Sequence, residues 1–256
     1  PFGERLPMAL AAIATILAAA SLGRAVAGPR GGVVAALTLA TCARFWLFSR
    51  QLSGDVYLTA CLTGAFALAL PALGEATAAA RRRLLLAHAL VAIGMLAKGP
   101  VILGLYAVPL ALTARLARPR VPLARLRPLA FGGLVLALGA PWFVYMAVRF
   151  PEYVGIYFGH HHFRRTLSDE LGGRGALYYL QALAGDAQPW ILLVPFAAWR
   201  LRGAADRRPA TLLAWIGAAF PLVLFTLATG KRNVYLLPLY PLVAAALAPL
   251  LLELYD

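Results

Sequence analysis

Charged residues are scarce in this chain of 256 residues. Only 13% of the residues are charged, whereas 62% are hydrophobic and the mean hydropathy is +0.76. A typical soluble domain has about 25% charged residues, so the composition excludes both a soluble domain and a disordered chain. The 2 cysteines, Cys42 and Cys61, lie in apolar stretches and are too few for a disulfide scaffold. Lipid is therefore expected to be the main solvent of the chain.

Lysine is rarer still, because 22 of the 24 basic residues are arginine and only Lys98 and Lys231 are lysine. The net charge of +14 would suit a protein that binds nucleic acid. However, the basic residues interrupt apolar segments and form no continuous stripe with interleaved aromatic residues. We therefore expect no nucleic acid partner, and we expect the arginines to contact membrane lipids and to set the orientation of the chain.

Long apolar runs separated by charge, proline or glycine predict helices that cross a membrane. A crossing needs roughly 20 apolar residues, and the runs lack the period-two alternation of strands. The expected fold class is all-α, a polytopic transmembrane bundle of about nine crossings in which residues 1–256 form a single domain. The predicted helices are residues 8–27, 32–49, 56–74, 84–97, 100–117, 129–148, 176–199, 209–228 and 234–253.

The loops between these helices differ in kind on the two sides of the predicted membrane. Arginine-dense loops all fall on one side, which the positive-inside rule makes cytoplasmic. The other side carries both lysines, three of the 4 histidines, several acids and the longest loop, residues 149–175. This mixture of charges predicts a functional site on the exterior side. The arginine-dense loops contain Arg24 and Arg30, then residues 81–83, 115–127 and 200–208.

Three polar residues at the exterior ends of predicted helices are candidates for this site. Asp55 begins the third helix, where it could cap the helix or orient a hydroxyl or head group of a substrate. Lys98 precedes Gly99-Pro100, and Lys231 follows Gly230 at the end of another helix. Either lysine could simply extend its ammonium to the membrane surface. Two lysines on one side, with no others in the chain, favour recognition of a phosphate.

The stretch from His160 to Arg165 is the most polar part of the long exterior loop. Consecutive histidines cannot all face one centre from a regular helix, and no ligand spacing supports a zinc site. A divalent metal ion bound by one histidine and Asp55 or Glu152 is the alternative, and no cofactor is firmly predicted. Arg164 and Arg165 could bind a phosphate through both guanidinium nitrogens, or could contact interfacial lipid.

Several motifs occur in an order and spacing that resembles the ArnT-like membrane glycosyltransferases. These enzymes belong to the GT-C superfamily, together with the protein-O-mannosyltransferases. The resemblance covers nearly the whole chain, although each motif alone is weak. The motifs are Leu96-Ala97-Lys98-Gly99-Pro100, Pro141-Trp142, His161-His162-Phe163-Arg164-Arg165, Gln188-Pro189-Trp190 and Gly230-Lys231-Arg232-Asn233-Val234-Tyr235-Leu236-Leu237-Pro238.

The resemblance implies a function and a set of site residues. It implies a polyprenyl-phosphate sugar donor, a lipid (lipid A-like) or glycan acceptor, and transfer on the periplasmic side of a bacterial inner membrane. By position, Asp55 matches the family acid and His162 matches the histidine that precedes the family arginine. The donor phosphate would contact Lys98, Arg165 and Lys231, and Tyr235 would support it at the boundary with the lipid.

The sequence also departs from the family pattern in two respects. His161 and Thr166 stand where the family has glutamate and an aromatic residue, so specificity for aminoarabinose is not implied. The family has a first crossing and an outer acidic pair that would precede Pro1, and many relatives have a soluble C-terminal region. We therefore expect the main catalytic acid upstream, an auxiliary role for Asp55, and no activity from residues 1–256 alone.

Two other functions fit the sequence. A transporter or flippase of a lipid-linked precursor would also need many crossings and interfacial arginines, but paired broken helices are not evident. A non-catalytic membrane subunit could use the exterior loop to dock a partner. The identity of the sugar and of the acceptor, metal dependence and oligomeric state do not follow from the sequence.

Overall fold

The chain folds into helices throughout the part that the computed structural model describes. Over these residues no strand is present, which confirms the predicted all-α class. The described residues are 2–152, 155, 175, 177–186, 189–203, 208–228 and 230–256.

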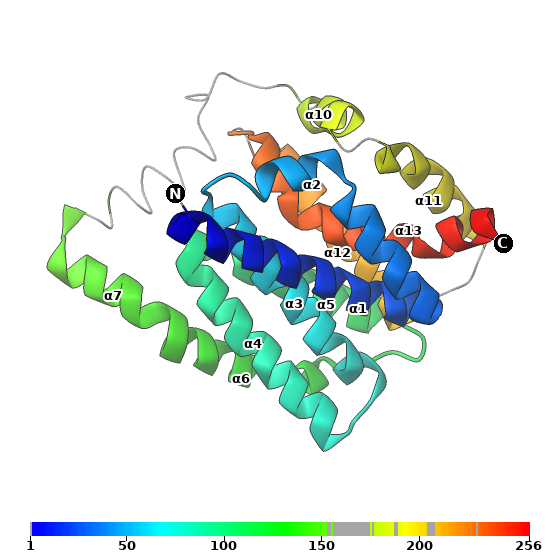
Figure 1. Cartoon of the computed structure of the whole chain (residues 1–256). Helices are drawn as coiled ribbons and strands as arrows, with labels where there is room; N and C mark the ends of the chain where they lie inside the picture. The colour runs from blue at the N-terminus through cyan, green and yellow to red at the C-terminus, as the bar shows by residue number, and fades with distance from the viewer. Residues whose placement is uncertain are drawn as a thin grey trace.

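The first helix, α1 (Phe2–Ala40), is a hairpin of two helical halves (Figure 1). It breaks at Ala27 and at Gly28, whose φ of 76° lies in the left-handed region that glycine adopts readily. The two halves approach closely, because a Cβ added at Gly23 would lie 2.4 Å from the Cβ of Ala35. The hairpin corresponds to the predicted helices 8–27 and 32–49. The second of these ends earlier than predicted, at Ala40, and a short α2 (Ala43–Phe48) follows.

Three further helices run back and forth across the bundle and position the site. They are α3 (Gly54–Gly74), α4 (Ala78–Lys98) and α5 (Val101–Leu116). Thr77 caps α4 by accepting a hydrogen bond from the amide of Ala80 at 3.1 Å. This cap starts α4 six residues before the predicted start at 84. At 21 residues each, α3 and α4 are about 30 Å long, the thickness of a bilayer's hydrocarbon core.

The predicted helix 129–148 is confirmed, with a π-helical turn in its middle. It comprises α6 (Pro128–Leu134), the turn Val135–Gly139 and α7 (Ala140–Arg149). By contrast, the prediction of a single helix over 176–199 is wrong. The chain forms α10 (Tyr178–Asp186), a 3-10 turn (Trp190–Leu193) and α11 (Val194–Gly203). Pro189 explains the break, because proline lacks an amide hydrogen and disfavours helical backbone in the residue before it.

The last part of the chain forms the most buried helix. After α12 (Pro209–Leu227), a 3-10 segment (Asn233–Leu239) leads into α13 (Tyr240–Tyr255). Nearly every residue in the first eleven of α13 is buried, and this helix packs along α1. At the far end of this pair, Arg30 and Asp256 form an exposed ion pair at 3.4 Å.

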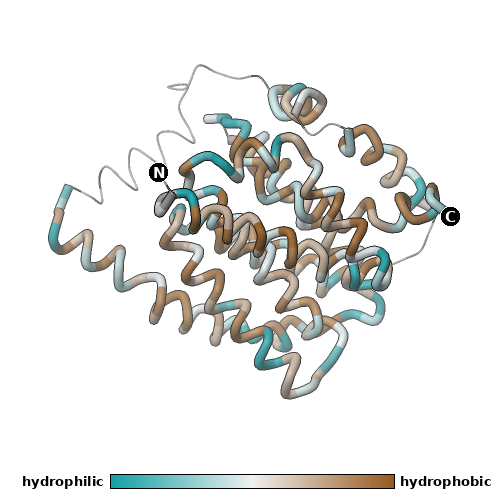
Figure 2. Tube along the Cα trace, viewed as in Figure 1, coloured by the Kyte–Doolittle hydropathy of each residue, from teal (hydrophilic) through white to brown (hydrophobic). Residues whose placement is uncertain are grey.

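Hydrophobic side chains also lie on the outside of the bundle, and hydrophobic residues recur along the helices (Figure 2). Leu129, Leu136 and Val148 are 91%, 69% and 78% exposed. Five helical segments among the described residues are long and apolar enough to cross a membrane. The chain is therefore an integral membrane protein, whereas the count of nine crossings stays a prediction. The five segments are Arg5–Ala40, Gly54–Gly74, Leu123–Arg149, Pro209–Leu227 and Asn233–Tyr255.

Candidate functional site

Asp55 lies in the first turn of α3 and is buried, with 9% of its side chain exposed. Ser53, not Asp55, is the residue that caps the helix, and its hydroxyl accepts from the Asp55 amide at 3.2 Å. The same hydroxyl donates to Asp55 Oδ2 at 2.7 Å. The other carboxylate oxygen, Oδ1, accepts from the ammonium of Lys98. Of the two roles considered for Asp55, the cap therefore belongs to its neighbour, and the carboxylate holds a cation.

Lys98 is the last residue of α4 and reaches across to α3. Its side chain is 29% exposed, so the ammonium is partly shielded but still accessible. Gly99 follows with a φ of 88°, and Pro100 begins the next helix. This left-handed glycine turns the chain sharply, so α4 ends at the lysine and leaves it at the rim of the bundle. Lys98 does not simply extend into the membrane surface, because it is held by a buried carboxylate.

Gly54 allows α3 and α4 to meet at this point. A Cβ added at Gly54 would lie 2.4 Å from the carbonyl oxygen of Ala97, a distance that real side chains do not reach. Any other residue would push the start of α3 away from the end of α4. The ion pair between Asp55 and Lys98 therefore depends on the absence of a side chain next to the aspartate.

The segment that precedes α13 brings a third element to the site. The ring of Tyr235 lies under the Lys98 ammonium, with 4.9 Å between Nζ and the ring centroid, which is a cation–π distance. Phe225 of α12 also packs against this ring, with 5.3 Å between the ring centroids. Arg232 is exposed and lies near enough to act on Lys98 as a like charge. The sequence analysis did not single out Arg232, and its place beside Lys231 was the available signal.

Lys231 is also in this segment, but its ammonium points into the protein. The residue is 6% exposed, and Nζ donates to the carbonyl oxygen of Ala228 at 2.6 Å. The two lysines of the chain therefore have different surroundings. Lys98 pairs with a carboxylate at an accessible rim, whereas Lys231 binds main chain at the end of α12.

Two tyrosines of α10 hold the segment in place. The Tyr179 hydroxyl accepts from the Arg232 amide at 3.1 Å and lies 3.3 Å from the Arg232 carbonyl oxygen, to which it donates. Tyr179 is fully buried, so these contacts are shielded from solvent. The hydroxyl of Tyr178 donates to the side-chain carbonyl of Asn233. Thus α10 sets the position of residues 232–235.

The structure brings together three of the six predicted site residues. Asp55, Lys98 and Tyr235 come from three different segments, and Lys98 contacts both of the others. Lys231 lies four residues before Tyr235 in the sequence. His162 and Arg165 lie outside the described residues. Within those residues, no group of three or more His, Cys, Asp or Glu side chains could hold a metal ion.

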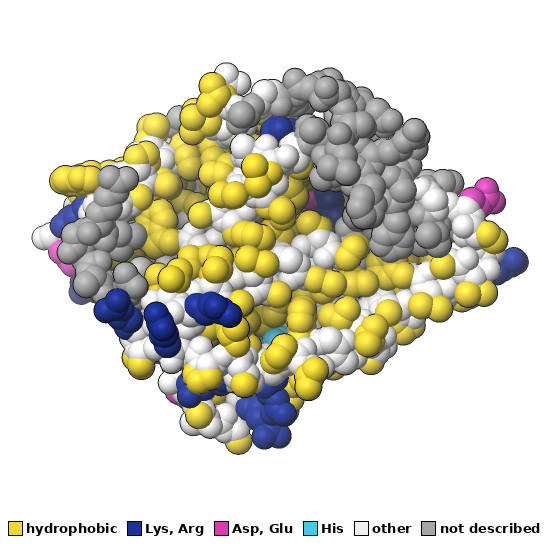
Figure 3. All heavy atoms as spheres, turned by 180° about the vertical axis from the view of Figure 1, so that it is seen from behind, with side chains coloured by type: hydrophobic (Ala, Val, Ile, Leu, Met, Phe, Trp, Pro, Cys, Tyr) yellow, Lys and Arg dark blue, Asp and Glu magenta, His cyan; other side chains and the backbone are white. Residues whose placement is uncertain are grey.

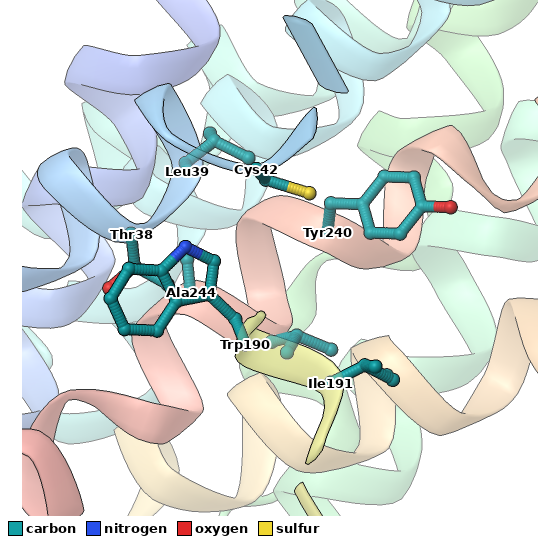
Figure 4. Close-up of a pocket in the computed structure, with 8 residues that line it drawn as sticks. Thr38, Leu39, Cys42, Trp190, Ile191, Tyr240 and Ala244 are labelled. Carbon is teal, nitrogen blue, oxygen red and sulfur yellow. The ribbon is translucent and has the colours of Figure 1, made fainter. Parts of the chain in front are cut away.

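The structure also contains a small pocket that none of these three residues lines (Figure 4). Its volume is about 10 Å³, roughly the space of a single water molecule. Trp190 borders it and donates from its indole nitrogen to the Thr41 hydroxyl at 3.0 Å. Cys42 also lines the pocket as a free thiol, and burial raises its pKa. The pocket is too small for a substrate, and its contacts attach the 190–193 turn to α1 and α13.

Comparisons with known proteins support the resemblance that the motifs predicted. The profile of the dolichyl-phosphate-mannose-protein mannosyltransferase family matches residues 2–145, more than half of the chain. The chain belongs to this family. The prediction of an ArnT-like, GT-C type of protein is thereby confirmed.

Among individual relatives, arabinosyl transferases stand out. The undecaprenyl phosphate-alpha-4-amino-4-deoxy-L-arabinose arabinosyl transferase of Edwardsiella ictaluri is 28% identical over 250 residues, which are 86% of this chain and 45% of that protein. The corresponding transferase 1 of Pseudomonas fluorescens is 33% identical over 123 residues, covering 44% of this chain and 22% of that protein. The chain thus spans less than half the length of these relatives.

A solved structure shows the same fold. The crystal structure of ArnT from Cupriavidus metallidurans bound to undecaprenyl phosphate superimposes with a TM-score of 0.84 and 26% sequence identity. The match covers 96% of this chain and 45% of ArnT. The similarity therefore extends beyond the profile match at 2–145.

Proposed function

We propose that the chain acts in a membrane glycosyltransferase that moves a sugar from a polyprenyl-phosphate donor to a lipid or glycan acceptor. The observation that carries this proposal is the Lys98 ammonium, held by buried Asp55 and by the ring of Tyr235 at an accessible rim. A compact cation at the end of a crossing is suited to the phosphate of a lipid that approaches through the bilayer. The family and the ArnT fold support the same reading.

The reaction forms one bond and breaks one bond at the sugar. The acceptor oxygen bonds to the anomeric carbon while the bond from that carbon to the phosphate oxygen breaks. The electron pair of the broken bond stays on the polyprenyl phosphate, and the acceptor loses its proton to a base. Negative charge therefore develops on the leaving phosphate, where Lys98 and the neighbouring Arg232 would stabilise it.

The other predicted residues have supporting roles in this proposal. Asp55 is auxiliary and acts through Lys98, because its carboxylate orients the ammonium and offsets the repulsion from Arg232. Tyr235 places an aromatic surface where phosphate and polyprenyl chain would meet. Lys231, His162 and Arg165 remain proposed ligands of the donor.

The relatives' names suggest the chemistry of donor and acceptor. They are named as undecaprenyl phosphate aminoarabinose transferases, and ArnT was crystallised with undecaprenyl phosphate. We infer an undecaprenyl-type donor and a lipid A-like or other periplasmic acceptor. The protein would lie in a bacterial inner membrane with the Lys98 end facing the periplasm, as the arginine-rich opposite end favours.

Product analysis with a labelled polyprenyl-phosphate sugar tests the proposal. The purified full-length protein should release free polyprenyl phosphate together with a glycosylated acceptor. Lys98→Gln should reduce this release by about 100-fold, the order seen when one charge-stabilising donor is removed. Arg82→Gln, which removes a cation at the opposite end of α4, serves as the matched control and should leave the rate unchanged.

Each alternative function gives a different result in this assay. Movement of labelled donor across a vesicle membrane without release of polyprenyl phosphate would indicate a transporter. Neither transfer nor movement, with α-helical content intact, would indicate a non-catalytic subunit. Equal rates for Lys98→Gln and the wild type would remove Lys98 from the phosphate site.

A further inference from the structure

A second charged site lies at the other end of α3 and α4. The two helices are about 30 Å long, so this end lies about a bilayer thickness from Asp55. There the α3–α4 connection faces residues 124–127 across a cavity of about 460 Å³. Small-molecule sites typically measure about 300–1,000 Å³, so this space can admit a ligand. Its polar lining consists of Glu75, Thr77, Arg81, Arg125 and Arg127.

The three arginines of this cavity have no counter-charge bound to them among the described residues. In the part of the chain that the structure describes, none of their guanidinium groups forms an ion pair or a hydrogen bond. Glu75 is the only acid of the lining, and it accepts from the Thr77 hydroxyl at 3.4 Å. The lining therefore carries an excess of two positive charges, which an anion of charge −1 would halve and an anion of charge −2 would balance.

The wall that carries Arg125 and Arg127 is fixed to the bundle. His88 of α4, only 1% exposed, bonds through Nε2 to the carbonyl oxygen of Leu126 at 3.0 Å. Its other nitrogen, Nδ1, lies 3.1 Å from the hydroxyl of buried Tyr106 in α5. A carbonyl oxygen only accepts, so Nε2 donates, and this bond ties the wall to the core. The position of the two arginines is thus set by buried contacts.

Arg127 also has an unusual backbone. Its φ is 51°, and it is the only described residue other than glycine with a positive φ. This left-handed conformation is unfavourable for a residue with a side chain, and such residues cluster at functional sites. Here it turns the chain from the 3-10 helix Leu123–Leu126 into α6 and leaves Arg127 on the cavity.

We propose that this cavity binds the phosphodiester head group of an anionic membrane lipid. A guanidinium donates to two phosphate oxygens at once, and three of them converge on one space at the level where lipid head groups lie. Glu75 and Thr77 can accept from a hydroxyl beyond the phosphate, as in a glycerol head group. Orientation of the protein accounts for arginines such as Arg82 and Arg83, but it does not require a cavity.

The lipid titration compares two arginines of one helix. Phosphatidylglycerol is titrated into the detergent-purified protein, and bound lipid is counted by native mass spectrometry. Arg81→Gln and Arg125→Gln should each weaken binding about fivefold, as expected for one cation near an anionic lipid. Arg83→Gln removes the same charge two residues from Arg81 but does not line the cavity, so it should leave binding unchanged.

Three results would overturn the proposal. Equal weakening by Arg81→Gln and Arg83→Gln would show a diffuse charged surface. Phosphatidylcholine binding as tightly as phosphatidylglycerol would show that the cavity does not select anions. Displacement of the lipid by an equal concentration of soluble glycerol phosphate would show a soluble ligand instead of a membrane lipid. Thermal unfolding of each variant separates loss of binding from loss of fold.

Discussion

The two ends of α3 and α4 differ in whether their charged side chains are paired. At one end a single acid and a single lysine face each other, and the side chain of Asp55 is only 9% exposed. At the other end the consecutive arginines 81–83 are all exposed, and the described residues offer them no ion-pair partner. Lysine and arginine side chains gather along that edge of the molecule, at the lower left in Figure 3.

The difference shows which charges in a membrane protein carry specific chemistry. Exposed arginines at an interface stay solvated and cost little, so their number can set orientation without specific contacts. A buried carboxylate is costly unless it is paired, so it persists where a defined partner is needed. The end that carries Asp55 and Lys98 therefore contains the candidate reaction site, although it has fewer charges. At the arginine-rich end, only the arginines that converge on a cavity suggest a site.

Among the substitutions that test this difference between the two ends, Gly54→Ala should have the largest effect on the rate of sugar transfer. Its Cβ would meet the Ala97 carbonyl, which must move by roughly 1 Å for ordinary contact, and such a displacement can cost about 100-fold in rate. Gly74→Ala at the other end of α3 meets nothing within 4 Å and is the control. Sugar transfer by the two variants measures the difference. Full activity of Gly54→Ala would show that close contact of α3 and α4 is not required.

Removal of the negative charge from the buried pair should have an intermediate effect. Asp55→Asn keeps the shape but leaves Lys98 beside Arg232 without a counter-charge, and we expect transfer to fall about 10-fold, as for a lost charge interaction of about 1.4 kcal/mol. Asp256→Asn makes the same change in the exposed pair with Arg30, where surface ion pairs contribute about 0–1 kcal/mol. A rate that is equally low in both variants would contradict the distinction between the two ends.

The smallest effect is expected from Tyr179→Phe, which affects the site only through the backbone of Arg232. The lost hydroxyl leaves the Arg232 amide without its partner, at a net cost of about 1 kcal/mol. We expect transfer to fall about fivefold, with the change mainly in KM for the donor because Arg232 loses its position. Tyr145→Phe, at an exposed tyrosine of α7, is the control. An unchanged KM would show that α10 does not set the position of this segment.

Much of the fold could be predicted because lipid imposes long apolar runs. The predicted starts and ends of α3, α5 and α12 agree with the structure to within two residues. The errors occurred where local chemistry competes with hydropathy. Thr77 caps α4 shortly before three arginines. These arginines lower the hydropathy of the first turns, so hydropathy alone placed the start of the helix too late. Pro189 interrupts a run whose hydropathy continues on both sides.

The site was predictable in its residue types but not in its contacts. The scarcity of lysine marked Lys98, and its position at the start of a predicted helix marked Asp55. Their contact could not be derived, because it depends on how closely two helices pack at Gly54. The inward direction of Lys231 and the exposure of Arg232 follow from the path of the chain after α12, which periodicity does not encode.

The central claim is that the Asp55–Lys98–Tyr235 cluster receives the phosphate of a polyprenyl lipid. A structure of the protein with bound undecaprenyl phosphate tests this most directly. In that structure we expect a phosphate oxygen within about 3.5 Å of Lys98 Nζ, with the first isoprene units against the ring of Tyr235. A phosphate bound at the arginine-rich end, or at the opposite end without contact to Lys98, would contradict it.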